Sequence, residues 1–188
     1  TRQELIARNG VEVYGKDLHL VGAIKSLNSD GVTASAGIRL KASRNIWGYS
    51  GGTDFLSNGS SIVIWSNASN TDGAIRFQDG TRICSSATFG AVTNGTAALS
   101  SCRTTGGADI HIAGGAAGNA NDGSTLNGTI PAGFAQGWGT VNYNTSLGSW
   151  SSGNGLLTGI SLGHLTTDAA HNTIQSGGGN IIMRGKAT

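Results

Sequence analysis

The 188-residue chain has few prolines, few charges and no long apolar runs. It contains one proline and two cysteines, and only 12% of its residues are charged. A single proline among 32 glycines that show no three-residue period excludes collagen. The low charge argues against an intrinsically disordered chain, because such chains are normally rich in charge. No stretch approaches the ~18 apolar residues of a membrane span, and no Lys/Arg run favours nucleic acid as a partner.

Sequence signatures of common enzyme classes are also missing. There is no Gly-x-Ser-x-Gly elbow, HExxH motif or P-loop, and the ten carboxylates are scattered singly. Asp72 and Asp79 form the closest pair outside the first segment, whereas a glycoside-cleaving β-helix needs two or three acids on one face. GNANDG (118–123) lacks the acidic residues of a calcium loop. The sequence predicts a protein that is not an enzyme and uses no cofactor or metal.

The chain does contain a recurring motif, Gly-x-[Asp/Asn]-apolar-x-apolar-x-Gly. Three copies fit it well: GKDLHLVG (15–22), GADIHIAG (107–114) and GGNIIMRG (178–185). Weaker copies start at 35, 59, 72 and 157. Each alternates apolar and polar residues, which is the pattern of a half-buried strand, and Gly/Asn/Ser clusters typical of corners separate them.

Most of these starts lie one or two multiples of 20–25 residues apart. This spacing predicts a single all-β domain over residues 1–188, a β-solenoid with roughly 20–25 residues per coil and about eight coils. A β-sandwich is the competing fold, because its strands also recur at regular spacing. The similarity among the motif copies favours the solenoid.

Three segments resemble the repeat region of filamentous-haemagglutinin-like exoproteins, which are large bacterial surface adhesins. The segments are GGADIHIAGG (106–115), IVIWSNASNTDGAIRFQDGTRI (62–83) and IQSGGGNIIMRG (174–185). The Asn-Pro motifs of that family's secretion domain are missing, since the only proline, Pro131, follows Ile130. The chain is therefore expected to be a downstream shaft segment of such a protein, or a different extracellular β-solenoid. The resemblance also implies a right-handed parallel β-helix that extends and binds without catalysis.

We expect a non-enzymatic structural or adhesive protein, either a rigid rod segment of a bacterial surface adhesin or a subunit of an extracellular filament. Low charge and abundant Ser, Thr, Asn and Gly favour an extracellular or cell-surface location. The chain opens on TRQEL, without an initiator methionine or a signal peptide, and we interpret it as a mature product or an excised piece. Expected partners are other copies or flanking repeats joined end to end, and glycans or a cell surface. The alternatives are a carbohydrate-binding module and a polysaccharide-degrading β-helix.

Asp109 and His111 in GADIHIAG invite interpretation as a metal or catalytic pair. Asp17 and His19 in GKDLHLVG are predicted to occupy the same register. Two ligands from one strand fall far short of the four of a typical zinc site. In the other motif copies, the residues predicted to align with these histidines are Arg39, Val63 and Ile182. We therefore interpret both pairs as the solvent-facing side of a strand.

Three further features are candidates for function. Cys84 and Cys102 bracket a long insertion. In a secreted chain this arrangement favours a disulfide, which is predicted to pin a protruding loop over 84–102. The alternatives are two buried free thiols or, rarely, a redox pair. The aromatic residues predicted to stack on sugar rings, if they do not instead fill the interior, are Trp138, Tyr143 and Trp150. N-glycosylation triplets begin at Asn58, Asn67, Asn94, Asn127 and Asn144.

The first 14 residues differ from the repeats because they carry both glutamates of the chain. We expect this segment to cap the solenoid or to join subunits end to end by strand addition. The residues predicted to form such an assembly arm are Glu4, Leu5, Ile6, Val11 and Val13.

Overall fold

The structure is a computed structural model in which all regular secondary structure described is β-strand. The described residues are 4–8, 10–27, 37–48, 53–69, 72–78, 80–90, 99–117, 131–136, 141–144, 149–152, 159–162 and 171–186. Most of these strands belong to three parallel sheets, which we call sheets A, B and C.

Each sheet draws its strands from widely separated parts of the chain. Sheet A contains β1 (Glu4–Ala7), β4 (Ala23–Ser26), β7 (Asp54–Ser57), β10 (Arg82–Cys84) and β19 (Thr173–Gln175), in that order. Sheet B contains β2 (Val11–Gly15), β5 (Ile38–Ala42), β8 (Ile62–Ser66), β13 (Ile110–Ala117) and β20 (Ile181–Met183). Sheet C contains β3 (Leu18–Leu20), β6 (Ile46–Gly48), β9 (Ile75–Phe77) and β18 (Ile160–Leu162).

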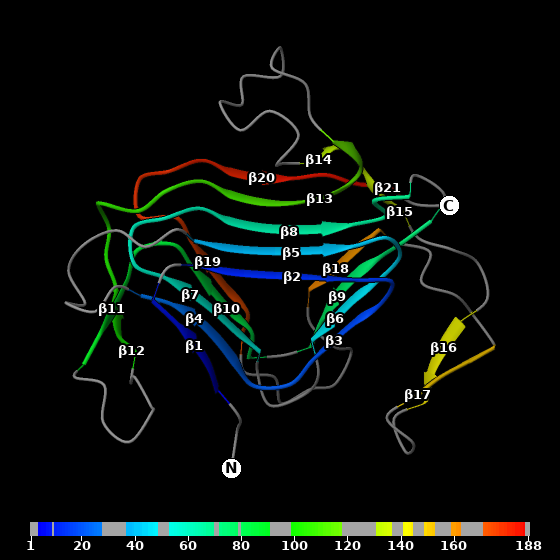
Figure 1. Ribbon diagram of the computed structural model, residues 1–188, viewed down its shortest axis with the longest axis horizontal. Helices are drawn as coiled ribbons and strands as arrows, with labels where there is room; N and C mark the ends of the chain where they lie inside the picture. The colour runs from blue at the N-terminus through cyan, green and yellow to red at the C-terminus, as the bar shows by residue number, and fades with distance from the viewer. Residues whose placement is uncertain are drawn as a thin grey trace.

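The chain visits the sheets in the order A, B, C, and we call each such round a pass. The first three passes are β1–β3, β4–β6 and β7–β9; the fourth is β10, β13 and β18, and the fifth begins with β19 and β20. Figure 1 shows β1, β2 and β3 outlining a triangle, with the strands of later passes stacked beside them. This all-β arrangement is compatible with the predicted β-solenoid.

The remaining strands lie within the fourth and fifth passes, between or after the strands of sheets A, B and C. They are β11 (Ala87–Phe89), β12 (Leu99–Cys102), β14 (Pro131–Gly133), β15 (Ala135–Gln136), β16 (Val141–Asn144), β17 (Ser149–Ser152) and β21 (Gly185–Lys186). Strand β14 pairs antiparallel with β13 and extends sheet B at the same edge as β20. Strands β11 and β12 form an antiparallel pair, as do β16 and β17, whereas β15 pairs with β21 in parallel.

One apolar core joins the three sheets. Alternate residues of each strand point inward, so that Ile38, Ile62 and Ile110 form a fully buried column of sheet B. Phe55 of sheet A meets Phe77 of sheet C with ring centroids 5.1 Å apart. Sixteen buried residues contributed by all three sheets form this cluster, which explains why the repeated motif carries two apolar residues at alternate positions.

The predicted spacing of 20–25 residues and the predicted number of coils are wrong in detail. Paired residues of neighbouring passes are 19 apart for Glu4 and Ala23 but 31 apart for Ala23 and Asp54. After the third pass, insertions lengthen the step to as much as 91, between Arg82 and Thr173. The described part of sheet A stacks five strands, and at about 4.8 Å per strand it is about 20 Å high.

Candidate functional site

Eight of the charged side chains described in the structure form four ion pairs between neighbouring passes. The pairs are Lys25–Glu4 (2.6 Å), Arg39–Glu12 (2.7 Å), Arg82–Asp54 (2.6 Å) and Arg44–Asp17. The partners are 21, 27, 28 and 27 residues apart, respectively. Sequence reasoning missed these pairs, although opposite charges separated by one pass length are a signal that it could have used.

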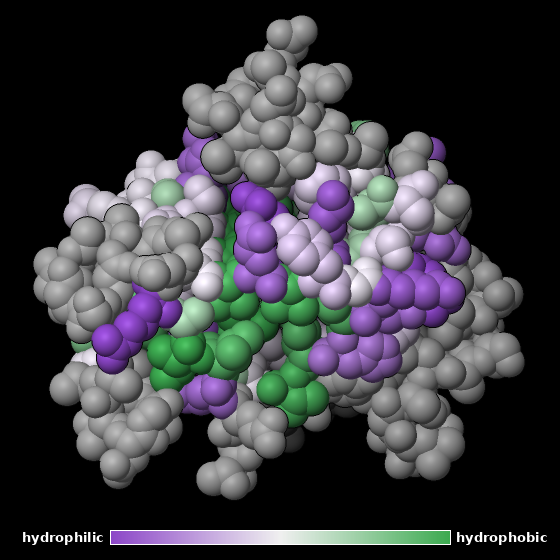
Figure 2. Space-filling model, viewed as in Figure 1, coloured by the Kyte–Doolittle hydropathy of each residue, from purple (hydrophilic) through white to green (hydrophobic). Residues whose placement is uncertain are grey.

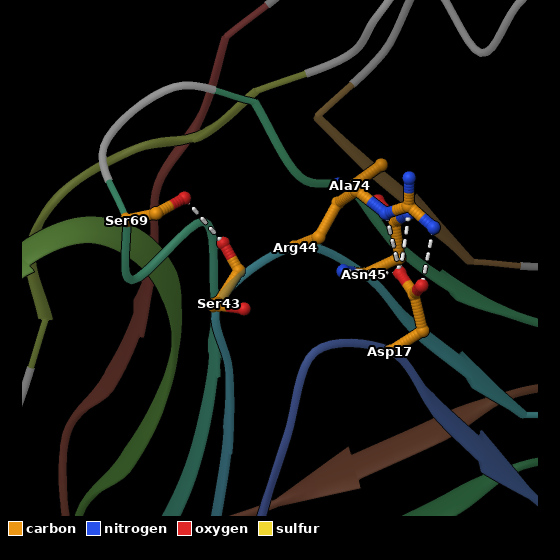
Figure 3. Close-up of polar contacts among 6 residues, drawn as sticks. All are labelled: Asp17, Ser43, Arg44, Asn45, Ser69 and Ala74. Atoms are coloured by element: carbon orange, nitrogen blue, oxygen red, sulfur yellow. Dashed lines mark hydrogen bonds and ion pairs between the residues drawn. The ribbon is translucent and has the colours of Figure 1, made fainter.

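Asp17 belongs to a ladder of hydrogen bonds at the corner before sheet C (Figure 3). Its Oδ1 accepts the backbone N–H of Asn45 (3.2 Å), the residue at the same corner of the next pass. The Oδ1 of Asn45 in turn accepts the backbone N–H of Ala74 one pass later (2.9 Å). Arg44 donates to both carboxylate oxygens of Asp17. The Asp/Asn position of the motif therefore joins one pass to the next.

The same device occurs on sheet B. Asp109 precedes β13, and its Oδ1 accepts the backbone N–H of Asn180, which precedes β20, at 2.7 Å. The acidic residue of GADIHIAG is thus an acceptor for the next pass.

Two titratable groups at the sheet C corner have shifted pKa values. Burial acts to raise the pKa of Asp17, but the hydrogen bonds and charge of Arg44, together with Asn45, outweigh burial and lower it. Burial lowers the pKa of His19, although the charge of Asp17 opposes this shift. His19 contacts the edge of Trp47, with ring centroids 4.3 Å apart.

The predicted equivalence of the two Asp/His pairs is wrong. His19 lies on β3 of sheet C, paired with Trp47, whereas His111 lies on β13 of sheet B. The predicted sheet B column is correct for its other members: Arg39, Val63, His111 and Ile182 align in that order, and Glu12 rather than His19 begins it. The sequence could not separate the pairs, because corners before sheets B and C use the same Gly-x-Asp pattern.

His111 also differs from the expectation of a solvent-facing side chain, because it is only 7% exposed. Its Nε2 lies 4.0 Å from Oδ2 of Asp109. No group of three or more His, Cys, Asp or Glu among the described residues is arranged to hold a metal ion. GNANDG (118–123) and Asp79 lie outside the described residues.

An open groove of about 610 Å³ runs along the outside of the corner between sheets A and B. Its described lining includes three positive-φ glycines, Gly10, Gly37 and Gly59, and the Glu12–Arg39 ion pair. Glu12 is the only carboxylate in this lining. An acid pair, which glycoside hydrolysis requires, is therefore missing from the described lining of the groove.

Cys84 and Cys102 form the predicted disulfide, with Cα atoms 6.2 Å apart. The described parts of segment 84–102 form the β11–β12 hairpin instead of a purely protruding loop. Cys84 and Ala87 pack on Leu56, which lies next to the core residue Phe55 on β7 and so faces outward. The disulfide thus holds the base of the hairpin against the outer face of sheet A.

The side chains of the predicted sugar-contact residues lie outside the described part of the structure. Trp138 lies outside the described residues, and of Tyr143 and Trp150 only the backbones are described, directly opposite each other on β16 and β17. Two other tryptophans, Trp47 and Trp65, are buried although they alternate with core residues, and Trp65 donates its indole N–H to the carbonyl of Gly115 at 2.8 Å. Glycan binding stays a prediction.

Two of the N-glycosylation triplets begin at buried side chains. Asn58 and Asn67 are almost completely inaccessible, so a folded chain does not offer them as acceptors. Asn94 and Asn127 lie outside the described residues, and Asn144 lies on β16, where only the backbone is described.

Exposed apolar side chains occur at the two ends of the stack. Among the described residues, the large exposed ones of the first pass are Leu5, Tyr14 and Val21, and those late in the chain are Phe134, Leu162, Ile181 and Met183. None lies in the second or third pass. In Figure 2, apolar side chains gather at the centre of the face that β1, β2 and β3 outline in Figure 1, with hydrophilic residues along the rim.

The predicted assembly arm is part of this first pass. Glu4, Leu5 and Ile6 lie on β1, which pairs with β4, and Val11 and Val13 lie on β2, which pairs with β5. These residues form the terminal strands of the stack rather than a separate arm.

The chain has no match among protein-family models, curated proteins or solved structures. In the part of the chain that the structure describes, no helix has the length and apolar character needed to cross a membrane. The resemblance to filamentous-haemagglutinin-like repeats therefore stays an expectation from the sequence.

Proposed function

We propose that the chain is a right-handed parallel β-helix that acts as a non-enzymatic structural segment of an extracellular or bacterial cell-surface fibre. The observation that carries this proposal is the register of the stack: in four successive passes, one strand from each pass joins each of three sheets around a single apolar core. A stack of this kind can be lengthened by adding passes without changing any existing contact.

The use of charge supports a structural role. The carboxylates of Glu4, Glu12, Asp17 and Asp54 are each held by a cation of the next pass. General acid–base catalysis needs acids that meet at a substrate, but these four are spread over three sheets. Their positions serve the alignment of passes instead.

Immunogold electron microscopy on the cells that produce the chain tests this function. The proposal expects label on fibres or on the outer surface. Label confined to the cell interior would overturn it, as would polysaccharide cleavage by the purified chain that disappears after a single Asp→Asn substitution.

A further inference from the structure

We propose that the two ends of the stack bind each other, so that a second copy of this chain docks head to tail. The C-terminal end of one copy, formed by β19 and β20, pairs in parallel with β1 and β2 of the next copy. This inference rests on the proposed structural function and adds the partner and the register of contact.

The first line of evidence is the position of strand edges that no other described strand pairs with. β1, β2 and β3 are the terminal strands of sheets A, B and C, and β19 is terminal at the other side of sheet A. β20 pairs only with β13 among the described strands. Open strand edges of this kind are templates for strand addition.

The second line of evidence is exposed apolar surface at both ends. Ile181 and Met183 continue the inner column of sheet B, yet they are 45% and 41% exposed. Leu5, in the inner column of sheet A, is 49% exposed. In the second and third passes the equivalent residues are buried, so one further pass at each end would cover these side chains.

The register of the docked strands follows from the columns of inward-facing residues in sheets A and B. Docking that continues sheet B places Ile181 opposite Val11 and Met183 opposite Val13, so that apolar residues face the core on both strands. Docking that continues sheet A places Ile174 opposite Leu5. Each of these pairs joins residues of the same inward-facing kind.

Polar groups at the two ends are complementary in this register. Residues 171–186 carry Arg184 and Lys186 but no acid, whereas the first pass carries both glutamates of the chain. Arg184 then lies opposite Tyr14 and diagonal to Glu12, a distance that long side chains span. The first pass also carries Arg8, Lys16 and Asp17, and both glutamates are ion-paired within the chain, so the rim adds only a weak charge preference to the apolar contact.

The corner ladder also continues across this contact. Asn180 follows Asp109 in the ladder and is exposed at the last pass. In the proposed register, Asn180 lies beside Gly10 of the docked copy. Its side-chain oxygen accepts the backbone N–H there, as Asn45 accepts that of Ala74 within the chain.

The test measures self-association of the full 188-residue chain by sedimentation velocity and electron microscopy. The wild type is expected to form linear oligomers with an axial repeat of about 24 Å, from five strands at about 4.8 Å each. Leu5→Arg and Met183→Arg each place a charge in the contact and are expected to weaken association by at least about 100-fold. Ser69→Arg adds the same charge at an exposed turn of the third pass, between the two ends, and is the matched control.

Mixing the two end variants separates head-to-tail from head-to-head docking. Leu5→Arg keeps an intact C-terminal end and Met183→Arg an intact N-terminal end, so an equimolar mixture is expected to form dimers and nothing longer. Asn180→Ala is expected to weaken association by about 2- to 10-fold. Asn180→Asp keeps the acceptor oxygen and is expected to associate as the wild type does.

Three results would overturn the inference. They are a wild type that stays monomeric at its solubility limit, oligomers that both end variants leave unchanged, and a mixture of the variants that stays monomeric. None of these results bears on immunogold localisation. The docking and the proposed function are therefore tested by separate experiments, and either can be refuted without the other. Circular dichroism of each variant verifies that a loss of association is not a loss of folding.

Discussion

Replacing Asp17 isolates the contribution of the corner ladder to stability. Asp17→Asn removes the charge that binds Arg44 but keeps an oxygen that can accept the backbone N–H of Asn45. Asp17→Ala removes both. The difference between the two variants therefore reports the acceptor, and the difference between wild type and Asp17→Asn reports the charge.

The exposure of the partners sets the magnitudes. The Arg44 side chain is 43% exposed, so its ion pair is close to a surface pair and contributes up to about 1 kcal/mol. Asn45 is fully buried, and Asp17 accepts hydrogen bonds from both its backbone N–H and its side-chain amide. Leaving such donors without an acceptor costs about 1–3 kcal/mol. We expect Asp17→Asn to lose about 1 kcal/mol and Asp17→Ala about 3 kcal/mol.

The pH dependence provides a second measurement. Because the pKa of Asp17 is lower in the folded protein than its ordinary value of 3.8, the charged form stabilises the fold above that value. This contribution is lost as the pH falls through the folded-state pKa. Urea unfolding followed by tryptophan fluorescence should therefore show a gap in unfolding free energy between wild type and Asp17→Asn near pH 7 that closes at a pH below the folded-state pKa. An equal gap at both pH values would refute the role of the charge, and equal stability of Asp17→Asn and Asp17→Ala would refute the role of the acceptor.

Three further changes test the disulfide, the core and the corners. Replacing Cys84 and Cys102 with serine should cost about 3 kcal/mol in urea unfolding because their link closes a separation of 18 residues, and reductant should bring the wild type to the same value; a reductant-insensitive wild type would contradict this. Phe55→Ala should cost about 3–5 kcal/mol, because the ring is fully buried, and a cost below about 1 kcal/mol would place the core elsewhere. Gly37→Ala should destabilise more than Gly178→Ala, because both have positive φ but only at Gly37 would a Cβ lie 2.3 Å from a carbonyl oxygen; equal thermal shifts would show that the close approach is unimportant.

Much of the strand pattern could be predicted from the sequence. The motif copies at 107–114 and 178–185 coincide with β13 and β20, which pair directly. The weaker copies at 35–42 and 59–66 coincide with β5 and β8. Period-two alternation and flanking glycines identify these strands because apolar residues face the core at alternate positions of sheet B, although the outward side chains of β8, Val63 and Trp65, are also apolar and buried.

Sheet A was not predicted, for a physical reason. Its strand β7 (Asp54–Ser57) is buried on both faces, because the β11–β12 hairpin covers the outer one. A strand covered on both sides does not alternate clearly between apolar and polar residues, so its sequence, DFLS, does not resemble the motif. Burial on both faces alone does not hide a strand, because β8 (Ile62–Ser66) is also buried throughout and its inward isoleucines still fit the motif.

The lengths of the passes were wrong because corners tolerate insertions. The core constrains which residue of one pass lies beside which residue of the next, but it does not constrain how many residues the chain uses between strands. Ile62 and Ile110 pair as directly as Ile38 and Ile62, although 48 residues separate the first two and 24 the second two. A loop grows at a cost of only about 0.6 kcal/mol per doubling of its length, so spacing is the weaker signal and inward alternation is the stronger one.

The repeated Asp/Asn of the motif follows from the same geometry. A strand that begins at a corner leaves a backbone N–H before the regular ladder starts, and an acceptor on the neighbouring pass satisfies it. Asp and Asn provide that acceptor on a short side chain, as Asp17, Asn45 and Asp109 show. A histidine two residues later points to the same side of the strand but takes no part in the ladder. The copies with Arg39 and Val63 at the histidine position carry Gly37 and Ser61 at the Asp/Asn position, so these corners of sheet B lack the Asp or Asn of the ladder. Where the motif has its Asp or Asn, it therefore identifies a corner at which the ladder joins one pass to the next. Asn180, at the last pass, is the one member of the ladder whose acceptor is predicted to reach a second copy.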